Sequence, residues 1–396
     1  MPTPAQAGAI LTIDLDAVVG NWRRLAERCG RACECGAVVK ADGYGLGAEI
    51  IAPALHAAGC RTFFVAHVEE GIRLRRVLSD TRTSIVVFNG PLPGSEPDFT
   101  LHRLLPVLNS PDQIGRWGDH AYARGAGALD AALHVDTGMA RLGLSPAETA
   151  ALLECPDRLD GVRLTLLMSH LACGDDPACP LNEEQRRVFG ALRRKFPGLR
   201  ASLANSPGIF LGPGWRFDLA RPGAALYGVN PTPLLPNPMA QVVRLQGKII
   251  QVRDVDSPQT VGYGATYRVP GRGRIATVAV GYADGYLRSL SNRGCGFIGD
   301  VRVPLVGRVS MDLATFDVSA VPVTDDGTGA GPGTLIDLIG PRTPIDAVAA
   351  DAGTIAYEIL TSLGGRYHRQ HLPVRSVDVH VHVHGVDARW GEPMEA

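Results

Sequence analysis

The chain has 396 residues, a length that fits two compact domains better than one. Its 39 Lys and Arg residues nearly balance 40 Asp and Glu residues, and the net charge of −1 gives no electrostatic basis for binding nucleic acid or a membrane. The first residues lack the basic and apolar regions of a signal peptide, and no uncharged run is long enough to span a bilayer, so we expect a cytoplasmic protein with reduced cysteines.

The first half of the chain alternates short apolar runs with segments of helical pattern. Most runs are continuous, which is typical of parallel strands buried on both faces. We expect eight strands, over Ala37–Lys40, Thr62–Ala66, Ser84–Phe88, Leu104–Leu108, Ala132–Val135, Arg163–Ser169, Ala201–Ala204 and Phe217–Arg221. Helices are expected between them, for example over Gly47–Ala58, Val68–Leu78 and Glu183–Phe196. Eight alternating units predict an α/β fold with an N-terminal (β/α)8 TIM-like barrel.

The Pro-rich segment 231–238 predicts a linker, and we place the domains at residues 11–236 and 237–396. Beyond the linker, strands joined by Gly, Pro and Asp turns predict a mainly β C-terminal domain. The expected strands are Val242–Val252, Arg274–Val280, Val301–Val309 and Thr334–Ile339, with one helix over Ile345–Leu363. A short N-terminal strand near Ile10–Ile13 fits either domain.

Polar and ionisable residues collect where the predicted barrel strands end. The group consists of Lys40, Asp136–Arg141, His170, Asn205–Ser206 and Arg221. In a barrel of this kind, the carboxyl ends of the strands form the face that carries active sites. The pattern therefore predicts an active site at this face rather than a patch that only stabilises the fold.

Lys40 closes the apolar run Ala37–Val39 and is a candidate Schiff-base lysine. Burial disfavours the ammonium form and lowers the pKa of a lysine, which helps an amine to react with an aldehyde. A lysine that simply reaches solvent through the barrel mouth also fits the run. The three glycines within residues 41–47 favour a site, because they allow the backbone to approach a ligand closely.

A candidate phosphate site follows the last two predicted strands. Ser206 comes after the seventh strand, and Gly223 opens a helix after the eighth. Loops at these places commonly bind phosphate in such barrels, through helix N-terminal amides and hydroxyl groups. Each residue alone also fits an ordinary helix cap. Combined with a Schiff-base lysine, they indicate a phosphorylated aldehyde cofactor, pyridoxal 5'-phosphate.

Two other clusters raise the question of a metal. The cysteines within Cys29–Cys35 lack the second closely spaced pair that zinc sites usually have. Asp378, His380, His382 and His384 alternate along one expected strand, which would place the three imidazoles on one face. Zinc binding there is conceivable, but an exposed strand near the C-terminus explains the pattern more simply. We therefore expect no metal.

Eight motifs occur in the order that is found in alanine racemases, and the sequence resembles this family essentially from end to end. The family is the two-domain group of fold-type III pyridoxal-phosphate enzymes. The motifs are AVVKADGYGLG (37–47), VDTGMARLG (135–143), MSHLA (168–172), ANSPG (204–208), ARPGAALYGV (220–229), GYGATY (262–267), GYADGY (281–286) and GRVSMD (307–312). Eight motifs in order are far more specific than any one of them.

The resemblance implies interconversion of L-alanine and D-alanine by two bases, which supplies D-alanine for peptidoglycan. Lys40 would bind the cofactor and act on the D-enantiomer, and Tyr263 would be the opposing base for the L-enantiomer. The chemistry agrees, because racemisation needs one group on each face of a planar carbanion. His170 and Arg221 match positions linked to this tyrosine by hydrogen bonds, and Arg221 also matches the arginine that faces the pyridine nitrogen.

The other matched positions concern the phosphate and the substrate. Phosphate contacts are implied for Tyr44, Ser206, Gly223, Ala224 and Tyr357. Contacts to the substrate carboxylate are implied for Arg141 and for the backbone of Met311. In the family, Tyr263 and Met311 belong to the opposite subunit, so the resemblance implies a homodimer with shared active sites.

Three positions depart from the family pattern. His134 stands where relatives often have a lysine that becomes carbamylated and braces the substrate-binding arginine. We expect His134 to be neutral and to accept a hydrogen bond from Arg141, or a chloride or water to fill the gap, although a simple strand-end role also fits. Ser202 stands where relatives can have a histidine, and Ser310 where some have a cysteine. A broader-specificity amino-acid or serine racemase and a non-catalytic pyridoxal-phosphate-binding protein are the alternatives.

Overall fold

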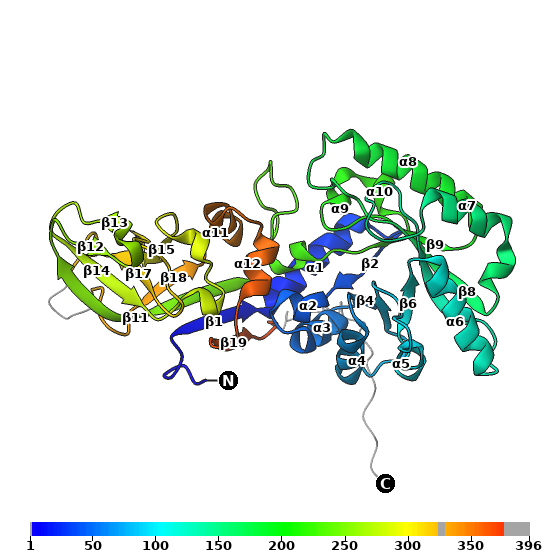
Figure 1. Cartoon of the computed structure of the whole chain (residues 1–396), viewed down its shortest axis with the longest axis horizontal. Coiled ribbons are helices and arrows are strands. Elements are labelled where there is room, and N and C mark those ends of the chain that lie inside the picture. Colours follow the sequence, from blue (N-terminus) through cyan, green and yellow to red (C-terminus); the bar gives the residue numbers. More distant parts are fainter. Residues whose placement is uncertain (1, 324–328, 376–396) are drawn as a thin grey trace, which may run out of the picture.

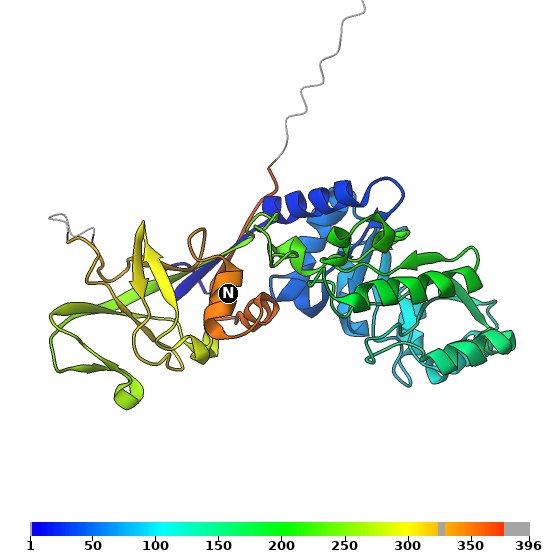
Figure 2. The ribbon, with the colours of Figure 1, turned by 90° about the horizontal axis from the view of Figure 1, so that it is seen from above.

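The computed structural model describes residues 2–323 and 329–375 of the chain. Figure 1 shows two parts, a barrel of strands and helices and a mainly β part. The helices α11 (Ile345–Ala352) and α12 (Ala356–Ser362) lie between them, as the turned view in Figure 2 also shows. The expected strand with Asp378, His380, His382 and His384 lies outside the described residues.

The barrel consists of short parallel strands in the order of the chain. Seven of them form one sheet: β3 (Ala37–Val38), β4 (Thr62–Val65), β5 (Ser84–Val87), β6 (Leu105–Leu108), β7 (Leu129–His134), β8 (Val162–Met168) and β9 (Arg200–Ser202). The eighth, β10 (Leu219–Ala220), pairs in parallel with β2 (Glu34–Cys35), which directly precedes β3. Backbone hydrogen bonds from Asp218 to Ala201 (2.9 Å) and from Gly36 to Ala220 (3.0 Å) connect β10 to both ends of the sheet. The predicted TIM-like barrel is confirmed.

Burial on both faces explains why these apolar runs form strands. In β4 all four residues are buried, and Phe63 and Phe64 are fully inaccessible. The main helices around the barrel are α1 (Leu15–Cys29), α3 (Ala48–Ala57), α4 (Val68–Val77), α5 (Glu96–Leu101), α6 (Pro111–Ala123), α7 (Pro146–Glu154) and α8 (Pro180–Lys195). Side-chain caps set where some of them begin: Asp14 accepts a hydrogen bond from the amide of Ala17 at the start of α1.

Shorter helical turns complete the chain. They are α2 (Lys40–Tyr44), α9 (Gly208–Leu211), α10 (Pro213–Arg216) and the 3-10 helices η1 (Pro156–Leu159), η2 (Ala224–Tyr227), η3 (Tyr263–Ala265), η4 (Tyr282–Asp284) and η5 (Arg288–Leu290). Across residues 2–323 and 329–375, no helix has both the length and the apolar composition that crossing a membrane requires.

The mainly β part is built on an eight-stranded sheet. Its main path is β16 (Val301–Pro304), β15 (Cys295–Ile298), β18 (Leu335–Ile339), β11 (Val243–Val255), β1 (Ala9–Asp14) and β19 (His368–Leu372), and β14 (Gly273–Val278) connects β11 to β17 (Ala314–Asp317). A separate pair is formed by β12 (Thr260–Val261) and β13 (Tyr267–Arg268). The N-terminal strand β1, which fitted either domain in the sequence, is antiparallel to β11 and parallel to β19. This sheet therefore contains strands from both ends of the described chain.

Two predicted elements of this part are shorter in the structure. The single helix expected over 345–363 is two helices, because Gly353 adopts a φ of 70° and ends α11. The strand expected over 301–309 stops at Pro304, and Gly307, with a φ of 77°, turns the chain beyond it. Both corrections follow from left-handed glycines, which interrupt an otherwise apolar pattern.

Candidate active site

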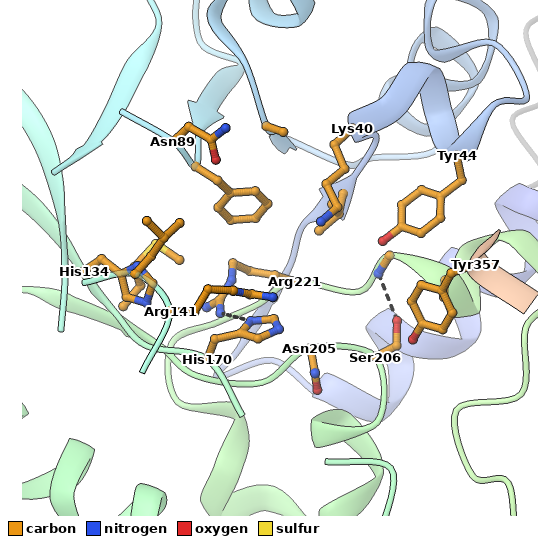
Figure 3. A pocket seen from close by; sticks show the side chains of 17 residues that line it. Lys40, Tyr44, Asn89, His134, Arg141, His170, Asn205, Ser206, Arg221 and Tyr357 are labelled. Carbon is orange, nitrogen blue, oxygen red and sulfur yellow. Dashed lines mark hydrogen bonds between the residues drawn. The ribbon is translucent and has the colours of Figure 1, made fainter. Parts of the chain in front are cut away.

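A cavity of about 450 Å³ opens at the carboxyl ends of the barrel strands (Figure 3). It brings together nine residues that the sequence proposed for the site: Lys40, Tyr44, Arg141, His170, Ser206, Arg221, Gly223, Ala224 and Tyr357. Eight of them lie in segments that follow barrel strands, whereas Tyr357 comes from α12. The size and the mixed polar and apolar walls suit a small-molecule ligand.

Lys40 extends into this cavity from the segment after β3. It begins α2, so the predicted strand over 37–40 ends early, at Val38. Burial, and then the positive charge of Arg141, lower the pKa of Lys40, while Glu70 acts in the opposite direction. The lower pKa increases the fraction of neutral amine, which is the form that reacts with an aldehyde.

The backbone after Lys40 forms a left-handed turn. Residues 41–45 all have positive φ values, between 52° and 80°, and three of these residues are not glycine. Non-glycine residues pay about 1–2 kcal/mol each in this region, so neighbouring groups must hold the turn. Glu70 accepts a hydrogen bond from the amide of Ala41 at 2.6 Å, and Asp42 accepts one from the amide of Ala48 at 2.9 Å. These carboxylates fix the direction in which Lys40 leaves the backbone.

Arg221 is a buried cation at the floor of the cavity, with 2 % of its surface exposed. Its Nη2 donates to the carbonyl oxygens of Ser169 at 2.6 Å and Leu203 at 3.4 Å, and its Nη1 donates to the hydroxyl of Ser202. Burial lowers the pKa of Arg221 to about 9, which leaves the guanidinium protonated at neutral pH. Ser202, one of the departures from the family pattern, thus holds this arginine in place.

His170 is neutral and accepts a hydrogen bond from Arg221. Nη2 of Arg221 lies 3.3 Å from Nδ1 of the imidazole (Figure 3). Burial, and then the charge of Arg221, lower the pKa of His170 well below its usual value, so the ring proton resides on Nε2. The buried Gln185 holds this segment, because it donates to the carbonyl of His170 at 2.8 Å and accepts from the amide of Ala172 at 2.9 Å.

Ser206, Gly223 and Tyr44 form one polar corner of the cavity. The hydroxyl of Ser206 accepts hydrogen bonds from the amides of Gly223 at 2.9 Å and Ala225 at 3.3 Å. A Cβ atom on Gly223 would overlap the hydroxyl of Tyr44, so only glycine allows the phenol this close to the backbone. Hydroxyl groups beside amides at the start of a helical turn, here η2 from Ala224, are the donors that a phosphate needs.

Tyr357 brings the mainly β part to the same corner. Its ring centroid lies 6.1 Å from that of Tyr44, which also packs against Tyr227 at 4.7 Å. Burial raises the pKa of both Tyr44 and Tyr357, so both keep a donating hydroxyl at neutral pH. The two parts of the chain therefore meet at the position expected for the phosphate.

Arg141 reaches the cavity from a loop that Asp136 organises. The Asp136 carboxylate accepts hydrogen bonds from the amides of Gly138 and Met139 at 2.9 Å and of Ala140 at 3.0 Å. Burial opposes ionisation, but these amides together lower the pKa of Asp136. The loop presents the Arg141 guanidinium at the cavity, where it is suited to a carboxylate.

His134 is buried and bonded to Asn109 rather than to Arg141. Its Nδ1 lies 2.8 Å from the side-chain oxygen of Asn109. The amide nitrogen of Asn109 donates to the carbonyls of Phe88 and Val107, both at 2.9 Å, which fixes the oxygen toward His134 and makes Nδ1 the donor. Burial lowers the pKa of His134 to about 4, so the ring is neutral. The hydrogen bond expected from Arg141 is not formed among the described residues.

Tyr263 and Met311, the other two predicted site residues, do not line the cavity of their own chain. Both lie in the mainly β part, where Tyr263 begins η3. Tyr263 is 71 % exposed and Met311 is 54 % exposed, high fractions for side chains with so much apolar surface. Both are therefore accessible to another molecule.

Two asparagines were not named by the sequence interpretation. Asn89 lines the cavity, and Asn109 sets the tautomer of His134. Each directly follows a predicted strand, just as His170 does. The rule that functional groups gather at strand ends, applied to every strand, would have found both.

The residues that line the cavity fit pyridoxal 5'-phosphate. The Nε of Arg221 is buried and has no hydrogen-bond partner within the described chain. A buried donor without an acceptor costs about 1–3 kcal/mol, so a ligand acceptor such as a pyridine nitrogen would satisfy it. Lys40 supplies the amine, and the hydroxyls of Ser206 and Tyr44 supply donors for a phosphate.

Family comparisons match both parts of the chain. The model for the N-terminal domain of alanine racemase matches residues 13–231, and the model for the C-terminal domain matches residues 242–371. An alanine racemase from Rhodospirillum rubrum is 55 % identical over 371 residues, which cover 93 % of this chain and 97 % of the relative. A relative from Mesorhizobium japonicum, named as a catabolic alanine racemase, is 49 % identical and covers 93 % and 94 % of the two chains.

Solved structures agree with the sequence matches. The alanine racemase from Bartonella henselae, with covalently bound pyridoxal phosphate, superimposes with a TM-score of 0.87 at 40 % identity and covers 92 % of this chain and 100 % of that chain. The biosynthetic alanine racemase from Pseudomonas aeruginosa gives a TM-score of 0.82 at 34 % identity, with 93 % and 100 % covered. On these matches the chain belongs to the alanine racemase family of enzymes and carries both of the family's domains.

Proposed function

We propose that this enzyme interconverts L-alanine and D-alanine with pyridoxal 5'-phosphate, using Lys40 and Tyr263 as opposing bases. The observation that carries the proposal is the buried Nε of Arg221, which has no partner in residues 2–323 and 329–375 and belongs to a residue that lines the same cavity as Lys40. When bound, the cofactor withdraws electrons from the substrate Cα and so makes its proton acidic. The protein must then hold the substrate and move one proton on each face of that carbon.

Lys40 holds the cofactor and serves one face of the substrate. Its lowered pKa favours the neutral amine, which accepts a proton from Cα and can return it. The left-handed turn at residues 41–45 keeps this amine pointed into the cavity. Arg221 would hold the pyridine ring of the cofactor through the N–H of its Nε, and it would retain its own proton, since its pKa of about 9 lies above neutral pH.

Arg141 orients the substrate by its carboxylate. The guanidinium can form two parallel hydrogen bonds to a carboxylate, which fixes both the position and the tilt of an amino acid. The backbone of Met311 is the second proposed contact. Because the Met311 side chain and Tyr263 are exposed and lie outside the cavity of their own chain, we assign both to the site of a second subunit, in a homodimer with shared active sites.

D-alanine made in this way would serve as a precursor of peptidoglycan. The Mesorhizobium japonicum relative carries a catabolic name, and a racemase that works in the opposite direction would feed L-alanine to metabolism. The same residues support both directions, because in each direction one base removes the Cα proton from one face and the other base delivers a proton to the opposite face. The net direction then follows from which enantiomer the cell supplies.

Exchange of the α-proton in D2O tests the two assigned bases. Lys40→Ala should remove the visible absorbance of the bound cofactor and lower racemisation by several orders of magnitude, because the anchor and one base are both lost. Tyr263→Phe should slow exchange from L-alanine by about 10²-fold or more relative to exchange from D-alanine, since only one face loses its base.

The matched control is Tyr122→Phe, which alters a tyrosine that is 89 % exposed and outside the cavity. It should leave both exchange rates unchanged. Equal slowing of the two enantiomers by Tyr263→Phe would reject the assignment. Comparable exchange on L-serine would favour a broader-specificity racemase, and cofactor absorbance without any exchange would favour a non-catalytic binding protein.

A further inference from the structure

A second cavity, of about 500 Å³, lies at the end of the barrel opposite to Lys40. We call it the basal cavity. Its walls include Ser84, Leu105 and Leu129, the first residues of β5, β6 and β7, whereas the active-site cavity lies where the strands end. The helices α4, α5 and α6, which are neighbours in Figure 1, complete the walls.

Positive charge dominates the basal cavity. Its charged residues are Arg75, Arg82, Arg103, Arg124, Arg163 and Asp130. Arg82 is paired with Asp80 at 3.2 Å, and Arg163 with Asp130 at 2.5 Å. Arg103 and Arg124 have no carboxylate partner in the part of the chain that the structure describes. Both are exposed residues, so two guanidinium groups face the solvent here without a carboxylate beside them.

Arg75 holds the wall that carries Arg103. It donates hydrogen bonds to the carbonyls of Thr83 at 3.0 Å, Arg103 at 2.9 Å and His102 at 3.2 Å, so its own donors are occupied. Burial, and then the charge of Arg103, lower the pKa of Arg75. Arg103 itself has a φ of 51°, a strained value for a residue with a side chain. The surrounding structure thus keeps two like charges close together.

Two residues that line the basal cavity each have a buried donor atom without a partner among the described residues. The indole Nε1 of Trp117 and the hydroxyl of Thr83 have no hydrogen bond among the described residues, although the two residues are only 2 % and 1 % exposed. Trp117 is fixed in α6 by edge contact with Phe99 and by stacking on His120. Buried polar groups are nearly always paired with protein, water or an ion. An indole N–H can only donate, so its missing partner must be an acceptor.

We infer that the basal cavity binds a small polyanion whose phosphate or carboxylate oxygens accept hydrogen bonds from Trp117 and Thr83 and neutralise Arg103 and Arg124. Water molecules would satisfy the donors but carry no charge with which to neutralise the arginines. A phosphorylated metabolite and a polycarboxylate share the required chemistry, acceptor oxygens with at least two negative charges. The ligand would connect the starts of three barrel strands and stabilise the barrel by mass action.

Calorimetric titration of the cofactor-loaded full chain tests this site, because the active-site phosphate position is then already filled. The probes are pyrophosphate and citrate, with chloride at matched ionic strength as the reference. We expect saturable binding of one probe molecule per chain and a higher unfolding temperature. The Arg103→Gln/Arg124→Gln double variant should weaken this binding by about tenfold or more. Tighter binding of pyrophosphate would identify a phosphorylated ligand, and tighter binding of citrate a polycarboxylate.

Three further variants distinguish a specific site from a general effect of positive charge. Arg158→Gln removes one exposed positive charge outside the basal cavity and should leave binding unchanged. Thr83→Val and Trp117→Phe each remove one unpaired donor without altering charge, and should weaken binding several-fold. If Trp117→Phe does not fold, Thr83→Val and the double variant still decide the question. Absence of saturable binding, or equal binding to the wild type and the double variant, overturns the proposal.

Discussion

Two histidines of the active-site cavity, His134 and His170, are neutral because burial opposes their protonation. The pKa of His134 falls to about 4, against an unperturbed value near 6.5 in the unfolded chain. Between these pH values the unfolded state binds more protons than the folded state, so stability decreases as the pH falls through this window. At the lower end of this window, one group with this shift has lowered the free energy of unfolding by about 3 kcal/mol.

His134→Gln should therefore flatten the dependence of unfolding free energy on pH. The glutamine amide can still donate to Asn109, but it does not titrate. Denaturant unfolding of the cofactor-loaded protein at several pH values between about 4 and 7 measures the slope. His67→Gln, at an exposed histidine, is the control and should keep the wild-type slope. An unchanged slope in His134→Gln would mean that His134 is not held neutral by the fold.

Single residues at strand ends were the most predictable part of the site. Lys40, His170 and Arg221 follow apolar runs, and the geometry of a barrel brings such positions to one face whatever the helices between them do. The Asn109–His134 bond was not predictable, because an amide that fixes a tautomer leaves no mark in sequence spacing. The expected hydrogen bond from Arg141 to His134 was wrong, because the His134 ring bonds to Asn109 instead, whereas the expected neutral ring agrees with its lowered pKa. A chloride or water beside Arg141 stays a prediction.

Among the elements, the left-handed turn at residues 41–45 depends most on its surroundings. It contacts α12 directly: Gly45 has a φ of 80°, and a Cβ atom there would lie 2.7 Å from the carbonyl oxygen of Leu360. The same helix carries Tyr357. The position of Lys40 is thus coupled to the mainly β part through a backbone contact that only glycine permits.

Gly45→Ala should destabilise the fold and weaken cofactor retention. Gly353→Ala is the matched control, since Gly353 is also a left-handed residue at the end of a helix, with φ 70° and ψ 34°, against φ 80° and ψ 5° at Gly45. Among the described residues, a Cβ atom on Gly353 would meet no more than the Nη1 atom of Arg293, at an ordinary contact distance of 3.9 Å. The control should lose about 1 kcal/mol from left-handed strain alone. Gly45→Ala should lose more and should release the cofactor several-fold faster, because the methyl group forces the turn and α12 apart. Unfolding titrations and cofactor dissociation rates measure both effects, and equal losses would contradict the coupling.

The strands were predicted well because buried parallel strands have a simple apolar pattern. The turn after Lys40 was not, since its left-handed backbone is held by Glu70, a residue of a different element. The break between α11 and α12 was missed because Gly353 lies in an apolar helical pattern that continues on both sides. Local sequence predicts that an element exists better than it predicts where tertiary contacts end it.

For the whole molecule, the exposure of Tyr263 leads to a test of subunit sharing. If each site takes Lys40 from one chain and Tyr263 from the other, inactive Lys40→Ala and Tyr263→Phe chains should regain activity when their subunits are exchanged. A mixed dimer then contains one site with both wild-type bases. Random exchange of equal amounts should restore about a quarter of the wild-type activity. Subunits that exchange, as mass spectrometry can show, but stay inactive would refute sharing.

The placement of β1 has a consequence for the order in which the protein is made. Residues 9–14 are synthesised before the barrel, but their partners β11 and β19 follow it in the chain, and β19 is the last strand of the described residues. While the barrel is being synthesised, both edges of β1 have no partner strand. An unpaired strand can pair with other chains. The sheet closes only when the C-terminal strand arrives, so its formation is a late, long-range step. A fragment that begins at the linker would lack β1, which lies between β11 and β19 in the sheet. A fragment with the barrel alone would contain β1 without its two partner strands. The barrel and the mainly β part are separate in space, but the sheet of the mainly β part can form only after the barrel has been synthesised.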